Sequence, residues 1–180
     1  MLRPERALLV VVDLQEKLLP AIPDRERVVR NSRLLLRLAK EVRVPVLFTT
    51  QYTKGLGAIV PDVRAEAPAA QLFDKTSFGC FGDEAIGAAV EAAGRDQLLI
   101  CGIETHICVA QTVLGAFEKG YEVHVASDAV GSRTEENHRV GLSRMERTGA
   151  VLSSAEMAVY ELLGRSDSPA FKQMLPLLKG

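Results

Sequence analysis

The chain has 180 residues, of which 47% are hydrophobic and 25% charged, and its formal net charge is −1 at pH 7. About 100–200 residues usually form one domain, so this length predicts a single domain whose own core needs no disulfide or structural metal. The near-zero net charge argues against nucleic acid or an anionic membrane as the main partner. No apolar run approaches the ~20 residues of a membrane span, and the first residues enter a strand pattern without a signal-peptide cleavage site.

The chain contains three cysteines, Cys80, Cys101 and Cys108. Because the number is odd and small, it does not indicate a disulfide framework of the kind found in secreted proteins. We interpret all three as free thiols and expect the cytoplasm, a reducing compartment, as the location of the protein.

Short apolar runs alternate along the chain with segments of helical periodicity. Residues 7–12 are continuously apolar, which is typical of a strand covered on both faces. Residues 24–42 carry apolar side chains on one helical face and charges opposite, and residues 54–68 form a loop rich in glycine and proline. In chain order the pattern predicts strand 7–12, helix 24–42, strands 46–48 and 71–74, helix 82–93, strand 98–101, helix 108–119, strand 123–126, helix 133–148, strand 150–152, and helices 155–163 and 168–175.

This order predicts a parallel sheet with helices on both faces, in one domain over residues 1–180. Its helical tail, residues 166–180, should end its last helix before Pro176 and carries an apolar stripe. The stripe either folds back on its own subunit or covers a contact with another. In such sheets ligands bind outside the carboxyl ends of the strands, so polar residues that follow strands are the functional candidates.

Three such residues stand out: Asp13 ends the first strand, Lys75 follows the third, and Cys108 begins the helix after the fourth. Taken singly, each has an ordinary alternative: a turn residue, a solvated charge and a small buried side chain. Parallel strands bring all three to one edge of the sheet. Their joint placement therefore favours a catalytic role over the three separate structural roles.

The chemistry would be nucleophilic attack by a thiol. A helix N-terminus and a nearby ammonium are expected to lower the pKa of Cys108, and a carboxylate can take the thiol proton and later deliver it to a leaving amine. Free backbone N–H groups in the turn before the helix could hold an oxyanion.

The motifs that contain these residues resemble a known family. Asp13 in VVDLQ, Lys75 in FDKTSF and Cys108 in GIETHIC look like the Asp-Lys-Cys triad of the isochorismatase-like cysteine hydrolases. The resemblance spans about residues 7–165, with the motifs in the family's order. The stretches TTQYTKGLG and VHVASDAVGSR look closest to the isochorismatase domain-containing proteins, a branch whose substrates are poorly defined.

The resemblance implies a Rossmann-like three-layer αβα sandwich with a six-stranded parallel sheet of order 3-2-1-4-5-6. It implies Cys108 as nucleophile, Asp13 as general base and acid, and Lys75 as the residue that positions both. A cis peptide would fall between Ile103 and Glu104, with Gly102 giving backbone freedom before it. The oxyanion hole would be formed by the backbone N–H groups of Glu104 and Cys108.

The sequence departs from the nicotinamidase branch, whose metal site uses an aspartate and several histidines after strand two. Here that stretch reads Gln51-Tyr52-Thr53, and the three histidines, His106, His124 and His138, are scattered. We therefore predict no catalytic metal and no cofactor, and structural roles for His124 and His138. The cysteine favours hydrolysis of a C–N bond through a thioester over the vinyl-ether cleavage of true isochorismatases.

Gln51, Tyr52 and Phe78 follow strands two and three, where they either line a pocket for a small-molecule substrate or serve as packing or subunit-contact residues. His106 either contacts substrate or hydrogen-bonds the loop, and the loop role is slightly preferred. The resemblance also implies a homo-oligomer.

Competing functions are less well supported. A phosphotransfer receiver needs a second acidic residue beside Asp13, which this chain lacks. An Asp-x-Asp phosphatase needs an aspartate two residues after Asp13, where this chain has Gln15. Neither G-x-G-x-x-G nor G-x-x-x-x-G-K-[ST] occurs, which argues against nucleotide binding. The alternative that remains is a catalytically silent oligomeric scaffold or binding protein with the same fold.

Overall fold

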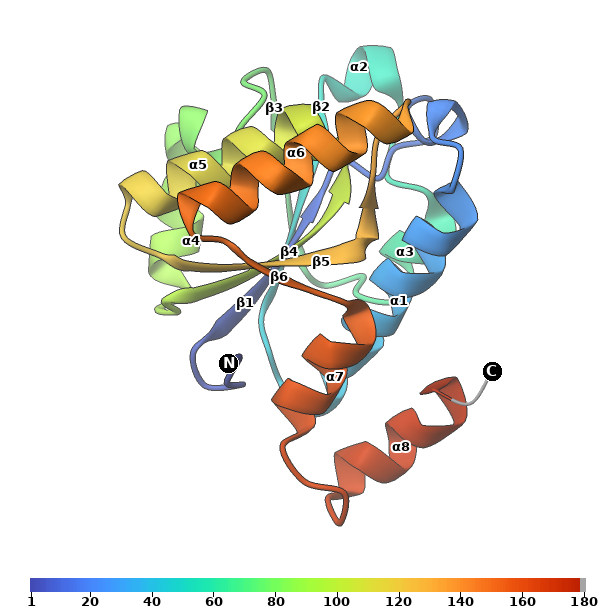
Figure 1. Cartoon of the computed structure of the whole chain (residues 1–180). Coiled ribbons are helices and arrows are strands. Elements are labelled where there is room, and N and C mark those ends of the chain that lie inside the picture. The colour runs from blue at the N-terminus through green and yellow to red at the C-terminus, as the bar shows by residue number, and fades with distance from the viewer. Residues whose placement is uncertain (179–180) are drawn as a thin grey trace.

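A six-stranded parallel sheet forms the centre of the computed structural model, which describes residues 1–178 (Figure 1). The strand order is β3-β2-β1-β4-β5-β6, so the predicted order 3-2-1-4-5-6 is confirmed. Strand order reverses between β1 and β4, and sheets of this kind usually bind their ligands at the carboxyl ends of the strands beside such a reversal. The strands are β1 Ala7–Val12, β2 Val46–Gln51, β3 Gln71–Lys75, β4 Gln97–Ile103, β5 Glu122–Gly131 and β6 Val151–Ser153.

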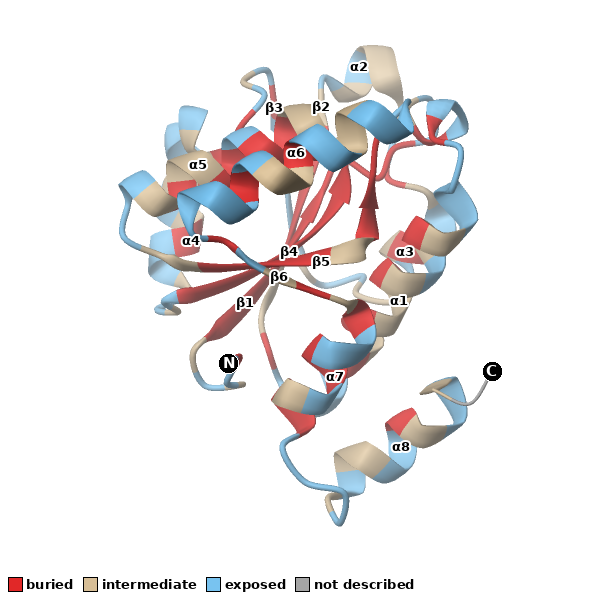
Figure 2. Ribbon diagram, viewed as in Figure 1, coloured by how far each residue is buried: buried red, intermediate tan, exposed pale blue. Residues whose placement is uncertain are grey.

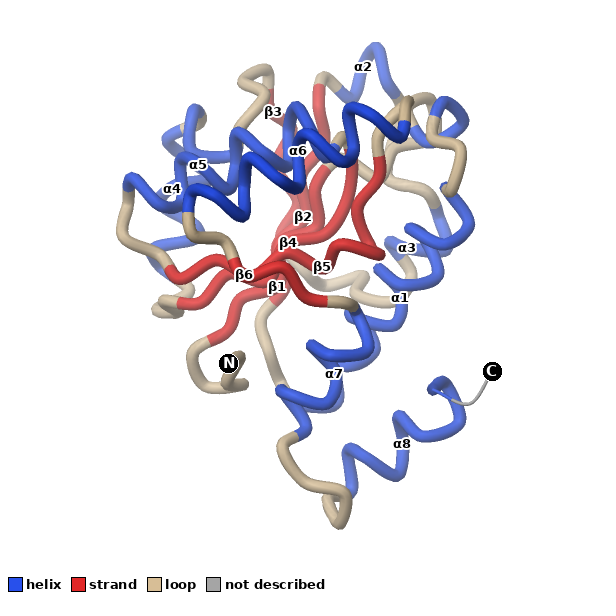
Figure 3. The backbone as a smooth tube through the Cα atoms, viewed as in Figure 1, coloured by secondary structure: helices blue, strands red, loops and turns tan. Residues whose placement is uncertain are grey.

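Helices cover both faces of the sheet and complete the predicted three-layer sandwich (Figure 3). One face packs α1 Arg25–Val42, α3 Pro61–Arg64, α7 Ala155–Leu163 and α8 Pro169–Leu178. The other face packs α4 Glu84–Ala92, α5 Ala110–Glu118 and α6 Glu135–Thr148. The short helix α2 Thr53–Leu56 lies at the carboxyl edge, beyond the end of β2.

Strand β1 is covered on both sides, and all six of its residues are therefore buried (Figure 2). Successive side chains of a strand point to opposite faces, so Leu9 and Val11 join the core under α1 while Leu8 and Val10 join the core under α5. Each fully buried aliphatic side chain stabilises the fold by about 1.5–3 kcal/mol.

Several boundaries differ from the sequence expectations. Strand β5 extends to Gly131, well beyond the expected 123–126, because its pairing with β4 resumes after a register shift. The expected loop 54–68 contains most of α2 and all of α3. The helix expected at 108–119 is preceded by a π-helical turn, Thr105–Val109, so Cys108 lies in that turn rather than at the start of a regular helix.

The tail folds back on its own chain. Helix α8 packs against α1 with Met174 buried, and Phe171 lies near Tyr160 of α7, with ring centroids 6.3 Å apart. Pro176 was expected to end the helix but lies inside its last turn, where a missing N–H costs a single hydrogen bond. Residues 179 and 180 of the predicted tail lie outside the described residues. Among residues 1–178, no helix is long and apolar enough to cross a membrane.

Gly102 is the position where β4 most closely approaches β1. Its φ is +121°, and a Cβ there would overlap the carbonyl oxygen of Val12. Only glycine fits such a conformation and such a contact, so Gly102 fixes the route of the chain into the turn that carries Cys108.

We predict that Gly102→Ala destabilises the protein by roughly 3 kcal/mol, because both the backbone conformation and the space forbid a methyl group. Gly87→Ala is the matched control, since Gly87 lies within α4 and a methyl group at that position would have nothing within 4 Å. It should be neutral or stabilising by about 0.5–1 kcal/mol. Denaturant unfolding measures both, and equal effects of the two changes would contradict the prediction.

Candidate active site

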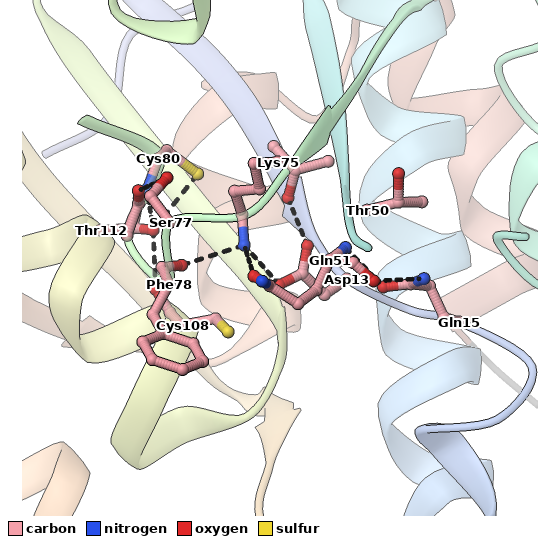
Figure 4. A network of polar contacts seen from close by, with 12 residues as sticks. Asp13, Gln15, Thr50, Gln51, Lys75, Ser77, Phe78, Cys80, Cys108 and Thr112 are labelled. Carbon is pink, nitrogen blue, oxygen red and sulfur yellow. Dashed lines mark hydrogen bonds and ion pairs between the residues drawn. The ribbon is translucent and has the colours of Figure 1, made fainter. Parts of the chain in front are cut away.

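The carboxyl ends of β1 and β3 and the turn after β4 bring Asp13, Lys75 and Cys108 together (Figure 4). The Lys75 Nζ atom lies 2.7 Å from Asp13 Oδ2, and the Cys108 thiol lies close enough to the Asp13 carboxylate for this group to raise its pKa. Cys108 is 6% exposed, and the other two side chains are fully buried. Three groups from distant parts of the sequence therefore meet in one nearly dry place.

Asp13 is held from several sides. Thr49 donates its hydroxyl to Asp13 Oδ1 at 2.7 Å, while Lys75 donates to Oδ2. The backbone N–H of Asp13 donates to the Thr49 carbonyl at 3.1 Å, and its φ of +52° turns the chain out of β1. A carboxylate can accept several hydrogen bonds at once, so these contacts orient the group and leave it able to accept from Cys108.

The Lys75 ammonium has an acceptor for each of its three protons. These are Asp13 Oδ2 at 2.7 Å, Gln51 Oε1 at 2.8 Å and the Phe78 carbonyl at 2.9 Å. A buried charge is tolerated when it is paired and hydrogen-bonded, and this set meets both conditions. With all three protons engaged, the ammonium serves as a fixed positive charge rather than as a free donor.

Burial raises the pKa of the Cys108 thiol to about 12, and the negative charge of Asp13 adds to the increase. The positive charge of Lys75 and the backbone N–H of Glu104 act in the opposite direction but are outweighed. The expectation of a lowered pKa at rest is therefore wrong, because a nearly closed site removes the water that would stabilise a thiolate. In this state Cys108 is a neutral thiol beside the Asp13 carboxylate.

The turn before Cys108 is fixed by contacts on both sides. The Ile103–Glu104 peptide bond is cis, and the Glu104 carbonyl accepts from the N–H groups of Ile107 and Val109, both at 3.1 Å. The Glu104 backbone N–H lies against the Cys108 sulfur, and the Glu104 carboxylate pairs with Arg133 at 2.7 Å.

Two histidines hold the same turn. His106 Nδ1 lies 3.0 Å from Ser132 Oγ, which is the loop role preferred from the sequence, and His138 Nδ1 lies 2.9 Å from Thr105 Oγ1. Gly141 of α6 lets this helix approach the backbone of His106 closely, since a Cβ there would lie 3.0 Å from the His106 Cα. These contacts tie the turn to β5 and α6.

The four residues expected to line a pocket have different positions. Tyr52 and Phe78 are 52% and 54% exposed beside the site, at positions open to a substrate. Gln51 instead directs its side-chain oxygen to Lys75, and its Nε2 donates to the Thr76 carbonyl at 2.9 Å. His106 is half-buried and engaged with Ser132.

The other thiols and histidines are structural. Cys101 is buried under α1, as expected, and Cys80 is buried beside Thr112, with its pKa raised by burial to about 11. His124 is buried in β5 and pairs with Glu122 at 2.9 Å. Within residues 1–178, no group of three or more His, Cys, Asp or Glu is arranged to hold a metal ion.

Sequence reasoning missed Thr49, Gln15 and Arg133. Thr49 is a buried hydroxyl that follows the apolar residues 46–48 of β2, and Gln15 is a fully buried amide two residues after Asp13. Polar residues near the carboxyl ends of central strands were a usable signal for both. Their partners could not be read, because they depend on the register of neighbouring strands.

Comparisons with known proteins identify the family of this chain. The model of the isochorismatase domain matches residues 7–157. The secreted isochorismatase effector Isc1 of Phytophthora sojae is 36% identical over 180 residues, covering 98% of this chain and 86% of the relative.

Solved structures are similar over nearly the whole chain. The MAR1 ribonuclease of Caenorhabditis elegans is 34% identical, with a TM-score of 0.94 and coverage of 99% and 92%. The YcaC gene product of Escherichia coli, described as an octameric hydrolase of unknown specificity, is 30% identical, with a TM-score of 0.92 and coverage of 98% and 89%. YcaC of Pseudomonas aeruginosa, solved with hexane-2,5-diol and covalent acrylamide, is 28% identical, with a TM-score of 0.92 and coverage of 98% and 90%. The resemblance noted from the motifs is thus confirmed, and the chain belongs to the isochorismatase-like hydrolase family.

Proposed function

We propose that this protein is a cysteine hydrolase that cleaves the C–N bond of a small amide, ureide or carbamate. Cys108 is the nucleophile, Asp13 is the general base and acid, and Lys75 fixes Asp13. The observation that carries the proposal is the buried cluster in which the Cys108 thiol lies beside a carboxylate that Lys75 holds at 2.7 Å. A nucleophile within hydrogen-bond reach of an oriented base is the arrangement that covalent catalysis requires.

The first step joins the Cys108 sulfur to the carbonyl carbon of the substrate while the thiol proton moves to Asp13. The tetrahedral oxyanion is held by the backbone N–H groups of Glu104 and Cys108, and a donor of this kind is worth about 10²–10³ in rate. Asp13 then gives the proton to the nitrogen, the C–N bond breaks and the amine leaves. The product is a thioester when the substrate is an amide, a thiocarbamate when it is a ureide, and a thiocarbonate when it is a carbamate.

The second step is hydrolysis. Water attacks the carbonyl carbon of the thioester while Asp13 takes one of its protons, and the C–S bond breaks. The proton returns from Asp13 to the Cys108 sulfur, which restores the neutral thiol. Because Asp13 receives and returns one proton in each half of the cycle, the resting thiol needs no separate activation.

The raised pKa of Cys108 suits this mechanism. A thiol that is neutral at rest resists oxidation, because the thiolate is the form that oxidants attack. It becomes nucleophilic when a carbonyl is in place and the proton can pass to Asp13. The covalent acrylamide in the related Pseudomonas YcaC supports a reactive nucleophile in proteins of this fold.

Two other functions are less well supported. A ribonuclease activity is suggested by the name of the Caenorhabditis relative, but this chain has a net charge of −1 and a triad buried from a polymeric substrate. A silent scaffold of the same fold would also be stable. Buried charges aligned on a thiol carry an energetic cost that a scaffold does not need, which favours the enzyme.

We further propose one hydrolase domain over residues 1–180 that assembles as a homo-oligomer in the cytoplasm and uses no metal or cofactor. The octameric Escherichia coli relative supports assembly. Three free cysteines favour a reducing compartment, although the Phytophthora relative is described as secreted.

We predict that Cys108→Ala lowers hydrolysis by about 10⁴-fold or more while the fold stays intact, because the covalent step is lost. The measurement is a screen of small amides, ureides and carbamates, with product amine or ammonia as the readout and RNA as a parallel substrate. Cys101→Ala is the control, since Cys101 lies in the core away from the site. Turnover that survives in Cys108→Ala, or RNA degradation that Cys108→Ala abolishes, would contradict the proposal.

A second prediction concerns alkylation by iodoacetamide, followed site by site with mass spectrometry. Cys108 should react faster than Cys80 or Cys101, at a rate that is nearly constant from about pH 6 to 8, because Asp13 is an internal base. In Asp13→Asn the rate should instead rise about tenfold per pH unit, since hydroxide must remove the proton. The same steep slope in the wild type, or a Cys108 no faster than the other thiols, would favour the scaffold.

We also predict that EDTA leaves hydrolysis unchanged, because the described part of the chain offers no ligand cluster for a metal. Activity with and without the chelator is compared after dialysis. A loss that added Zn²⁺ or Mn²⁺ restores would show that the chemistry depends on a metal.

A further inference from the structure

The Gln51 side chain is the neutral side chain among the three acceptors that hold the Lys75 ammonium. Two of the three acceptors, the Asp13 carboxylate and the Phe78 carbonyl, belong to the proposed base and to the main chain. The third is Gln51 Oε1, at 2.8 Å. Because the Lys75 side chain is fully buried, water cannot replace a missing acceptor.

The Gln51 amide cannot turn away from Lys75. Its Nε2 donates to the Thr76 carbonyl at 2.9 Å, which leaves Oε1 directed at the ammonium. If the amide were flipped, two donors would face each other at Lys75 and two acceptors would face each other at Thr76. The hydrogen-bond partners therefore define the orientation of the side chain.

Gln15 fixes the main chain of Gln51. The Gln51 N–H donates to Gln15 Oε1 at 2.7 Å, and Gln15 Nε2 donates to the Gln51 carbonyl at 3.1 Å and to the Gly57 carbonyl at 2.7 Å. This fully buried amide links the end of β2 to the loop that contains α2. The exposed Tyr52 begins that loop, so the position of Gln51 is coupled to the rim of the site.

We propose that Gln51 is a positioning residue for the chemistry of Cys108, acting through the Lys75 ammonium and the Asp13 carboxylate. This inference rests on the proposed function, since it assigns a second layer of residues to the same site. It replaces the expectation that Gln51 contacts substrate. Gln15 acts one step further out, by holding Gln51 and the 52–57 loop together.

Loss of the Gln51 acceptor would change the electrostatic field at Cys108 and Asp13. The charged groups that act on Cys108 are Asp13 and Lys75, and both also act on the neighbouring Cys80. Without its third acceptor, the ammonium is held less firmly beside Asp13 and its positive field at the Cys108–Asp13 pair weakens. A pair that feels less positive charge takes up an additional proton at a higher pH.

The test is the pH profile of Cys108 alkylation by iodoacetamide in Gln51→Met, which keeps the shape of the side chain but removes the acceptor. The pH at which the rate falls to half on the acid side should move up by about one unit, because one hydrogen bond to a charged group is lost. Gln51→Asn, whose shorter side chain withdraws the oxygen, should shift the profile in the same direction.

Thr50→Val is the matched control on the same strand. Thr50 precedes Gln51 in the strand and is buried. Its hydroxyl donates to Asp74 and does not contact Lys75. It should leave the acid half-point unchanged, even if it lowers the thermal midpoint of unfolding. The two readouts separate a positioning role from a purely structural one.

A Gln51→Met protein with a lowered thermal midpoint and an unchanged profile would overturn the inference, as would an equal shift in Thr50→Val. Should Gln51→Met fail to fold, Gln51→Asn carries the same two outcomes. A different result would contradict the proposed function, namely a wild-type Cys108 that reacts no faster than Cys80 or Cys101. The alkylation assay therefore distinguishes the two failures.

Discussion

The buried ion pair between Lys75 and Asp13 is the interaction on which the rest of the site depends. Its 2.7 Å contact lies where neither side chain is exposed, so both charges rely on protein partners instead of water. Thr49, Gln51 and the Phe78 carbonyl supply those partners. The pair fixes one carboxylate in one orientation, and that orientation decides what the Cys108 thiol can donate to.

The topology explains how such a pair forms in a small domain. Parallel strands end at one edge, and strand order reverses between β1 and β4, so the residues that follow these strands meet there. The sheet core keeps water away from the strand ends, and Gly102 allows β4 to pass against Val12 and enter the Cys108 turn. The same burial that makes the ion pair strong also makes the thiolate costly, which is why Cys108 is neutral at rest.

Much of this could be predicted from the sequence. The apolar run 7–12 and the alternation of strands and helices indicated the layers, and the family motifs indicated the strand order together with Asp13, Lys75 and Cys108. The pKa of Cys108 was mispredicted, because it depends on how far the site is closed, and closure is set by loops with no periodic signal. The contacts of Gln51 with Lys75 and Gln15 were not predicted for a related reason, since only the register of neighbouring strands brings these residues together.

The protonation state of Cys108 in the resting protein is the most direct test of the account. A difference infrared spectrum between the wild type and Cys108→Ala at neutral pH isolates the S–H stretching band of this one thiol. We expect a band whose frequency is lowered by a strong acceptor, Asp13, and which moves when Asp13 is replaced by Asn. A spectrum without an S–H band at Cys108 would mean a resting thiolate paired with Lys75, and it would contradict the claim that the closed site keeps the proton on sulfur until a substrate arrives.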